Sequence, residues 1–244
     1  MEEVENISNK NFTIVLPAFN EEKTIVKTLE AAIATGASEI IVVDDGSNDD
    51  TVALLSPFLE SHKQLRVISH SENQGCGVAK KTGIISSTND IVLVCDSDIE
   101  NINQDMMIKP VLPIFKKEAD FVLASFESFG RVAEYLVKPL LSFLVPELAH
   151  LKQPISGMFA LNRSYIDPEK MDSGYGMAGI LLNAYFKGAK IKEADIGTMI
   201  HRHRSDEDKR DHARTACKCI LRYCTDQGII KVNPEIYENF KMKK

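Results

Sequence analysis

Two aspartates, Asp96 and Asp98, flank a single residue directly after the apolar run Ile91–Cys95. In an extended backbone, alternate side chains project to the same side, so both carboxylates would face one way. Carboxylate oxygens suit Mg²⁺ or Mn²⁺, because these ions prefer oxygen ligands and keep positions open for substrate phosphates. Asp96 and Asp98 are therefore candidate catalytic residues at a metal and diphosphate site. A solvated turn, in which Asp and Ser are common, is the simpler alternative.

A second acidic segment, Asp44–Ser47, lies at the end of the apolar run Glu39–Asp44. An aspartate there can accept hydrogen bonds from a uracil or ribose edge. The same segment also resembles a helix start, because Ser47 or Asn48 is a suitable N-cap for the residues that follow. The two interpretations are compatible with each other.

A glycine-containing segment, Asn73–Gly77, precedes a helical pattern that includes Lys80 and Lys81. Glycines at a helix N-terminus let backbone N–H groups approach a phosphate. An ordinary glycine turn would have the same composition. The segment alone does not distinguish between these two roles.

Short apolar runs alternate with helical patterns in the first part of the chain. The expected strands are 12–17, 39–44, 65–69 and 91–95, and the expected helices are 21–34, 49–59 and 77–85. Such uniformly apolar strands predict an α/β fold with a mostly parallel sheet that helices cover on both faces. Ligands bind at the carboxyl ends of such strands, where the polar segments lie. Later in the chain we expect helical segments at 132–144 and 177–186, a turn at 153–157, a charged segment at 201–214 and a further helix.

The composition excludes some classes of protein. The chain has 244 residues, a formal net charge of −6 and a pI near 5.6, which argues against nucleic-acid binding because such binding needs a surplus of Lys and Arg. The N-terminus lacks a signal-peptide pattern and no run approaches the roughly 18 apolar residues of a membrane span, so we expect a cytoplasmic protein. Five cysteines without a CxxC pair predict free thiols rather than disulfides or a zinc site.

Four segments in order resemble the nucleotide-sugar half of family 2-type glycosyltransferases with the GT-A fold. These segments are 15–22, 42–51, Asn73–Gly77 and 96–98. The second half is similar to glucosyl-3-phosphoglycerate synthases, at 130–134, 138–141, 146–148, 153–157, 174–176 and 201–204. The resemblance implies one glycosyltransferase domain over 1–244, with a nucleotide-sugar half at 12–98, an acceptor half at 99–214 and a C-terminal helical extension at 215–244.

The resemblance also implies a role for each matching residue. The donor, a nucleotide diphospho-sugar, would be bound by Pro17, Ala18, Asn20, Glu21, Asp44, Asp45, Ser47, Gly75, Cys76, Asp96 and Ser97. A Mg²⁺ or Mn²⁺ ion would be bound by Asp98 and His201. A small anionic acceptor would be bound by Arg131, Ser156, Gly157, Tyr175, Arg202 and Arg204. Transfer with retention of the anomeric configuration and a homodimer are expected as well.

Three positions depart from the resemblance. Cys76 stands where the family has a lysine, Ala133 where it has a threonine, and Ala178 where it has a glutamate. These departures fall on donor and acceptor contacts. Because of them, the resemblance does not by itself identify UDP-glucose as the donor or 3-phosphoglycerate as the acceptor.

Two other functions remain open at the level of sequence. In a polyprenyl-phosphate glycosyltransferase, the apolar residues of 135–145 would form an interfacial surface, although a buried helix has the same pattern. In a non-catalytic nucleotide-sugar-binding protein, the three departures would reflect lost turnover. Arg202 and Arg204 could also pair with nearby acidic residues, Asp206, Glu207 and Asp208, instead of binding an acceptor.

Overall fold

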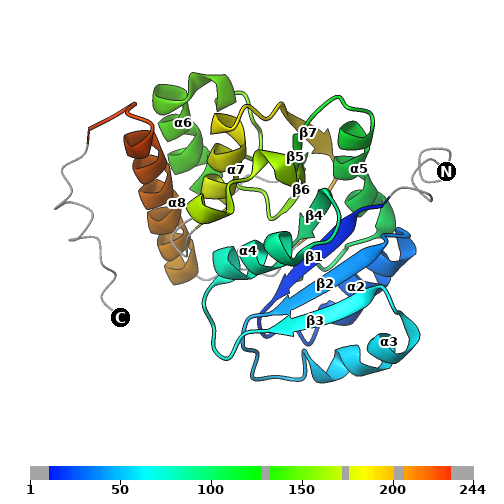
Figure 1. Cartoon of the computed structure of the whole chain (residues 1–244). Coiled ribbons are helices and arrows are strands. Elements are labelled where there is room, and N and C mark those ends of the chain that lie inside the picture. Colours follow the sequence, from blue (N-terminus) through cyan, green and yellow to red (C-terminus); the bar gives the residue numbers. More distant parts are fainter. Residues whose placement is uncertain (1–10, 128–131, 172–175, 201–205, 232–244) are drawn as a thin grey trace.

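A seven-stranded sheet forms the centre of the protein (Figure 1). The structure is a computed structural model, and it describes residues 11–127, 132–171, 176–200 and 206–231. In spatial order the strands are β3 (Leu65–Ser69), β2 (Glu39–Asp44), β1 (Thr13–Ala18), β4 (Ile91–Cys95), β6 (Met158–Asn162), β5 (Phe121–Ser125) and β7 (Ile191–Asp195). Only β6 runs antiparallel to its neighbours, β4 and β5. The expected mostly parallel α/β fold is confirmed.

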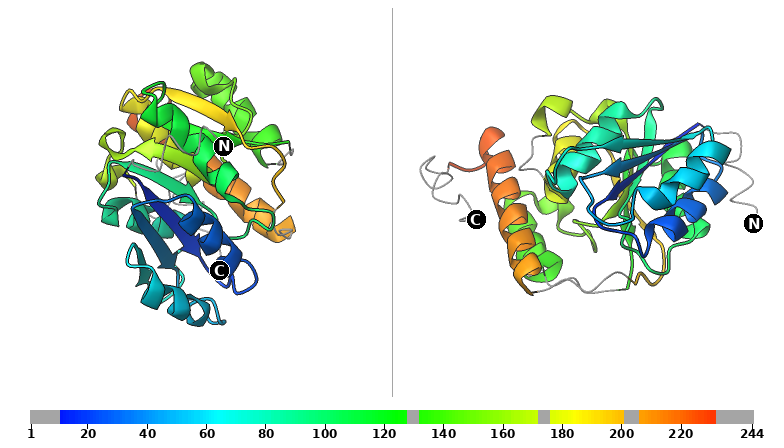
Figure 2. Two further views of the ribbon diagram at one scale, coloured as in Figure 1. Left: turned by 90° about the vertical axis from the view of Figure 1, so that its right-hand side faces the viewer. Right: turned by 90° about the horizontal axis from the view of Figure 1, so that it is seen from below.

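Helices cover both faces of the sheet (Figure 2). One face packs against α2 (Ile25–Ala34) and α5 (Gln104–Phe115). The other packs against α4 (Cys76–Ser86), α6 (Lys138–Leu144), α7 (Met177–Phe186) and α8 (Asp206–Asp226). The remaining helical elements are short: η1 (Ala53–Leu55), α3 (Ser56–Ser61), η2 (Ala133–Val137), η3 (Pro146–Leu148), η4 (Arg163–Tyr165) and η5 (Pro168–Lys170).

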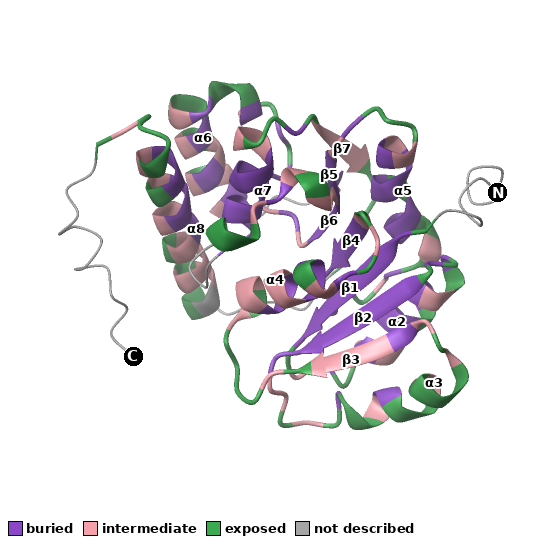
Figure 3. Ribbon diagram, in the orientation of Figure 1, coloured by how far each residue is buried: buried purple, intermediate pink, exposed green. Residues whose placement is uncertain are grey.

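The two faces explain why the central strands are apolar throughout. Along β1, Ile14 and Leu16 belong to the core beneath α2 and α5, whereas Val15 belongs to the core beneath α4. Both sets of side chains are fully buried, and Figure 3 shows the central strands as the most buried layer. A strand with alternating polar residues would expose one face, so the absence of alternation predicts this arrangement.

Two predicted helices begin later than the sequence pattern suggests. Helix α2 starts at Ile25 rather than at residue 21, because Asn20 adopts a positive φ of 55° and the N–H of Glu21 donates to Thr51 Oγ1 at 2.8 Å. The predicted helix 49–59 consists of η1 and α3 instead. The Asp49 carboxylate accepts a hydrogen bond from the backbone N–H of Thr51 at 3.0 Å, and such local bonds compete with helix formation.

The second half contains elements that the sequence analysis did not predict. Helix α5 has Pro110 and Pro113 inside it, and strands β5, β6 and β7 are five residues each. The predicted helical stretch 132–144 is a π-helical turn, η2, continued by α6. Helix α8 runs through residue 214, where the acceptor half was expected to end. Among the described residues, no helix combines the length and apolar character of a membrane span.

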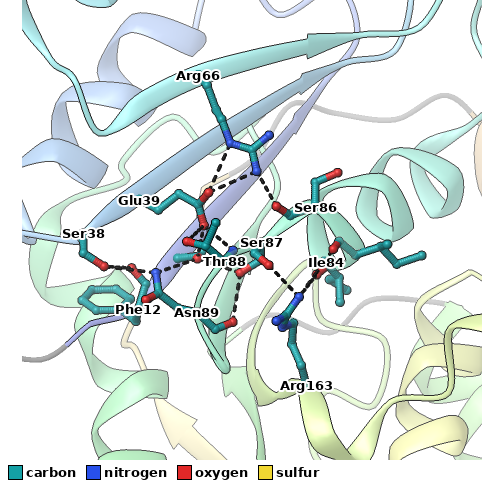
Figure 4. A network of polar contacts seen from close by, with 12 residues as sticks. Phe12, Ser38, Glu39, Arg66, Ile84, Ser86, Ser87, Thr88, Asn89 and Arg163 are labelled. Carbon is teal, nitrogen blue, oxygen red and sulfur yellow. Dashed lines mark hydrogen bonds and ion pairs between the residues drawn. The ribbon is translucent and has the colours of Figure 1, made fainter.

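A closed polar network occupies the amino edge of the sheet (Figure 4). The Glu39 carboxylate accepts hydrogen bonds from Thr13 Oγ1 at 2.6 Å, from the N–H and hydroxyl of Thr88 at 2.8 and 3.0 Å, and from two nitrogens of Arg66 at 3.1 Å. Burial raises the pKa of Glu39, but these hydrogen bonds outweigh burial and leave the pKa below its ordinary value. Glu39 is therefore ionised in the folded protein at neutral pH.

Two arginines cap the C-terminal end of α4 in the same network. Arg66 donates to the carbonyl of Ser86, and Arg163 Nη1 donates to the carbonyl of Ser87 at 2.6 Å and more weakly to that of Ile84 at 3.4 Å. Cationic donors at a helix C-terminus satisfy carbonyls that lack intrahelical partners and complement the helix dipole. The amino edge of the sheet thus stabilises the end of α4.

Candidate functional site

The predicted donor segments meet at the carboxyl edge of β1, β2 and β4. Ser97 Oγ, just after β4, donates to the carbonyl of Pro17 in β1 at 2.9 Å. The N–H of Asn20 donates to Ser47 Oγ, after β2, at 3.0 Å. Parallel strands bring their carboxyl ends to one edge, and the structure confirms that these segments lie together there.

Asp45 is the link between β2 and the glycine segment. Its side chain is buried, and its oxygens accept hydrogen bonds from the N–H of Gln74 at 3.1 Å and of Gly75 at 2.7 Å. His70 Nδ1 also lies 2.6 Å from Asp45 Oδ1. Asp45 therefore fixes the loop that begins α4, and in this structure its carboxylate is engaged by the protein itself.

The turn after β2 is equally constrained. Asp44 Oδ1 accepts a hydrogen bond from the N–H of Ser47 at 3.1 Å, which closes the turn. The helix start expected at Ser47 or Asn48 is wrong, because the next helical element, η1, begins at Ala53 with Val52 as its N-cap. Gly46 has a φ of +77°, and a Cβ built there would lie 2.7 Å from the carbonyl carbon of Glu72. Only glycine fits between the two loops, so Gly46 sets their close approach.

Asp96 lies between α4 and the start of β6. On one side, Lys80 Nζ is 2.8 Å from Asp96 Oδ1, and Cys76 Sγ is 3.9 Å from the same oxygen. On the other side, the N–H of Asp96 donates to the carbonyl of Gly157 at 3.1 Å. A Cβ at residue 157 would lie 2.0 Å from Asp96 Oδ2, so the glycine leaves the space that the carboxylate fills.

The charges at this edge shift the pKa values of neighbouring groups. Burial lowers the pKa of Lys80, but the adjacent Asp96 carboxylate outweighs burial and raises the pKa above its ordinary value, so Lys80 is an ammonium at neutral pH. Burial raises the pKa of Cys95, and the carboxylates of Asp96 and Asp98 raise it further. Cys95 is therefore a neutral thiol beside a pair of carboxylates.

The segment that leads to residue 201 is held next to the residues that follow Asp98. The N–H of Ile200 donates to Asn101 Oδ1 at 2.8 Å, the N–H of Glu100 donates to the carbonyl of Ile200 at 2.7 Å, and Asn101 Nδ2 donates to the carbonyl of Thr198 at 2.8 Å. The described residues contain no group of three or more His, Cys, Asp or Glu side chains that could hold a metal ion. His201 lies outside the described residues, whereas Asp98 offers the oxygen ligand that Mg²⁺ or Mn²⁺ prefers, so the described part of the site fits such an ion.

Several predicted acceptor residues are not among those that the structure describes. These are Arg131, Tyr175, Arg202 and Arg204. Ser156 is buried, and its hydroxyl donates to the carbonyl of Met158 at 3.0 Å. Ala133 and Ala178 are both buried, and Ala178 belongs to the core beneath α4, so both positions add apolar surface where the resemblance implies polar side chains. The acceptor assignments stay predictions.

The ion pair between Lys80 and Asp96 was not predicted from the sequence. The available signal was spacing: Lys80 is four residues after Cys76, which places both side chains on one face of a helix. None of the five cysteines, all of which lie among the described residues, forms a disulfide bond, as the sequence predicted.

Comparisons with known proteins agree with this geometry. The glucosyl-3-phosphoglycerate synthase of Mycobacterium tuberculosis is 28% identical over 250 residues, which cover 91% of this chain and 76% of the relative. A crystal structure of that enzyme with Mn²⁺, UDP-glucose and phosphoglyceric acid has a TM-score of 0.78, with 27% identity over 92% of this chain and 83% of the other. A second crystal structure, with Mg²⁺ and UDP, has a TM-score of 0.79, with 26% identity over 92% and 83%.

A family profile described as Glycosyl transferase family 2 matches residues 13–179. The matched part contains strands β1 to β6 and the described segments of the carboxyl edge. The segment that ends at residue 200 lies outside the match. This chain therefore belongs to glycosyl transferase family 2 and is a glycosyltransferase.

Proposed function

We propose that this glycosyltransferase transfers a sugar from a UDP-sugar to a small anionic acceptor, in the presence of Mg²⁺ or Mn²⁺ and with retention of configuration. The proposal rests on one observation: the polar residues that follow three strands meet at one edge of the sheet. At the same edge, the backbone of residue 200 is hydrogen-bonded to residues 100 and 101. A nucleoside diphosphate needs hydrogen-bonding groups for its base and ribose and a cation for its phosphates. In this proposal the polar side chains of the edge would contact the nucleoside, and an ion bound at Asp98 would meet the phosphates.

The nucleoside would contact the segment 17–21 and the turn after β2. Pro17, Ala18 and Glu21 belong to a backbone that Ser97, Ser47 and Thr51 fix by hydrogen bonds, so its shape does not depend on the ligand. Preorganisation of this kind lowers the entropic cost of binding. Asp45 would act mainly by holding the glycine loop, since its oxygens already accept two backbone hydrogen bonds.

Asp98 and His201 would bind the metal ion. When bound, the ion would neutralise the charge that develops on the departing diphosphate. Asp98 is the third residue after β4, and the segment before His201 is hydrogen-bonded to Asn101, three residues further on. This anchoring supports the pairing of residues that are far apart in sequence.

The acceptor would be bound by Arg131 with Arg202 or Arg204, because guanidinium groups suit phosphates and carboxylates. The relative of known structure binds phosphoglyceric acid. Ala133 and Ala178 are buried where the resemblance implies polar side chains, so the acceptor of this chain need not be the same molecule. Ala178 also provides no carboxylate base, which is compatible with proton transfer from the acceptor hydroxyl to the leaving phosphate.

A screen of UDP- and GDP-sugars for metal-dependent release of the nucleotide tests the proposal. We expect release of UDP from at least one UDP-sugar with Mg²⁺ or Mn²⁺, and loss of that release in EDTA. Release only from GDP-sugars would refute the choice of donor, and equal rates in EDTA would refute the metal. A single product anomer that matches the donor would support retention, and the opposite anomer would refute it.

Transfer to a polyprenyl phosphate is a second candidate, and one specific observation favours it. Around α6, Val137, Leu141 and Val145 are buried, but Tyr135 and Phe143 are 82% and 83% exposed. Exposed aromatic side chains are typical of surfaces that enter a membrane interface. Sedimentation of the protein with anionic lipid vesicles, lost on substitution of both aromatics by serine, would favour this acceptor. Recovery of the wild-type protein entirely in the supernatant would exclude it.

A further inference from the structure

Lys80 is a buried cation beside Asp96, at the edge of the sheet where the donor is proposed to bind. Its side chain is almost inaccessible, on the face of α4 that carries Cys76 one turn earlier, and its ammonium lies 2.8 Å from Asp96 Oδ1. Cys76, by contrast, is exposed at the first position of the helix. The cation that contacts Asp96 thus comes from residue 80, one helical turn after Cys76.

A stabilising role alone does not account for this pair. Removing two charges from water costs several kcal/mol per ion, and a buried ion pair often contributes no more stability than apolar side chains of similar size. Position 80 lies next to buried Ala79 and Ile84, where an apolar residue would pack without that cost. The partner of the ammonium is Asp96, the first aspartate of the candidate diphosphate site, and this choice of partner indicates a role in the site.

We propose that Lys80 is the donor-site cation of this chain and that it acts through Asp96, so that the protein binds a nucleoside diphosphate without a lysine at residue 76. The inference rests on the proposed function. Lys80 fixes one carboxylate oxygen, Gly157 leaves room for the other, and the carboxylate is thereby held in one orientation for the donor. The ammonium also balances negative charge that the diphosphate adds at this edge. Lys80 is a positioning residue in this scheme.

The test compares three variants with the wild-type protein, using UDP affinity in the presence of Mn²⁺ and kcat/KM with the best UDP-sugar. Lys80→Met removes the ammonium and retains a long side chain. Lys81→Met is the matched control, because it removes the same charge from the next residue of α4, which points about 100° away around the helix. Cys76→Lys in the Lys80→Met background returns a cation to the site from one turn earlier.

We expect Lys80→Met to lower kcat/KM about 10- to 100-fold, as loss of a hydrogen bond between charged groups would. Lys81→Met should stay within about twofold of the wild type. The double variant should recover at least about half of the decrease in log(kcat/KM) that Lys80→Met causes. A merely structural lysine would lose and regain the thermal midpoint together with the activity, whereas a role in the site changes kcat/KM at an unchanged midpoint.

Equal activity of Lys80→Met and Lys81→Met would overturn the proposal. Failure of Cys76→Lys to restore activity, with all variants equally folded by thermal denaturation, would overturn it too. If Lys80→Met does not fold, Lys80→Gln, which keeps a polar head group, takes its place in the same comparisons. A wild-type protein that neither binds UDP nor uses any nucleotide sugar would refute the proposed function itself, and that outcome is recognised before any variant is compared.

Discussion

The two ends of helix α4 lie in different polar environments at opposite edges of the sheet. At the amino edge, Glu39 accepts five hydrogen bonds from Thr13, Thr88 and Arg66, and arginines cap the helix (Figure 4). At the carboxyl edge, a buried ammonium faces Asp96, and the helix begins at a glycine loop. Both edges contain buried charge, but only the carboxyl edge gathers acidic residues from three strand ends.

This difference shows how similar ion pairs can serve different purposes. The Glu39 carboxylate is surrounded by donors from the protein, so its interactions are complete without a ligand and should stabilise the fold. The Asp96 carboxylate forms an ion pair with Lys80 and fills the space beside Gly157, which has no side chain. Asp98 follows two residues later in the sequence. Substitutions at the amino edge should therefore lower stability, and substitutions at the carboxyl edge should lower activity.

Among substitutions that change no charge, we expect Gly157→Ala to lower activity the most. The new methyl would lie 2.0 Å from Asp96 Oδ2, so the carboxylate must rotate away from its present position. A displacement of about 1 Å in an active site can lower activity about 100-fold. We expect a loss of that size in kcat/KM, measured by UDP release, with a thermal midpoint within a few degrees of the wild type.

Gly83→Ala provides the matched control. Its methyl would lie 2.1 Å from Cγ1 of Val15, a buried side chain of β1. Overpacking of a core costs about 1–3 kcal/mol, so this variant should lose stability and retain the activity of its folded fraction. The opposite pattern, with Gly157→Ala unstable and fully active, would contradict the assignment of the two regions.

Glu39→Ala should produce the largest loss of stability at the amino edge. The substitution leaves the hydroxyl of Thr13, the N–H of Thr88 and the guanidinium of Arg66 without their acceptor. Unsatisfied buried groups cost about 1–3 kcal/mol each, although Arg66 is 41% exposed and can turn to water. We expect unfolding by urea to show a loss of about 2–3 kcal/mol, with kcat/KM unchanged. A large loss of activity in the folded variant would show that the edges are coupled.

The contribution of Glu39 should depend on pH. Because the folded-state pKa of Glu39 is below its unfolded value, its stabilising effect is present above the unfolded pKa and declines as the pH falls through the folded pKa. The difference in unfolding free energy between wild type and Glu39→Gln should therefore be constant above about pH 5 and shrink in more acidic solution. A difference that grows on acidification would mean that the sign of the shift is wrong.

Arg163→Met should have the smallest effect. Methionine removes the hydrogen bond to the carbonyl of Ser87, but it also removes Arg163 Nε, which is buried without a hydrogen-bond partner. The two changes partly offset each other, so we expect a loss of about 0.5–1 kcal/mol by denaturant unfolding. Loss of more than about 2 kcal/mol would show that the cap on α4 is stronger than its geometry indicates.

The strands of the first half were predictable because their physical signal is local. An apolar run such as 39–44, buried on both faces and followed by acidic residues, leaves few alternatives. Strand β7 gave no such signal, because its residues, Ile191–Asp195, include three charged side chains and are partly exposed at the sheet edge. Helix α5 was hidden by Pro110 and Pro113, whose cost is offset by the apolar face that α5 buries.

The site was predictable to the level of segments but not of contacts. The rule that ligands bind at strand carboxyl ends selected Asp45 and Asp96 correctly as neighbours of the same edge. It could not show that Asp45 would be engaged by the glycine loop, nor that Lys80 would reach Asp96. Those contacts depend on the packing of α4 against the sheet, which is long-range information that a single sequence does not contain.

Calorimetric titration of UDP, with Mn²⁺ or with EDTA, is the most direct test of the central claim that the carboxyl edge is the donor site. Asp98→Asn and Asp90→Asn make the same change at opposite ends of β4. We expect the wild type and Asp90→Asn to bind UDP in a Mn²⁺-dependent manner, and Asp98→Asn to bind it at least about 100-fold more weakly, because a ligand of the ion is lost. Equal affinities for the two variants, or affinity that EDTA leaves unchanged, would contradict the claim.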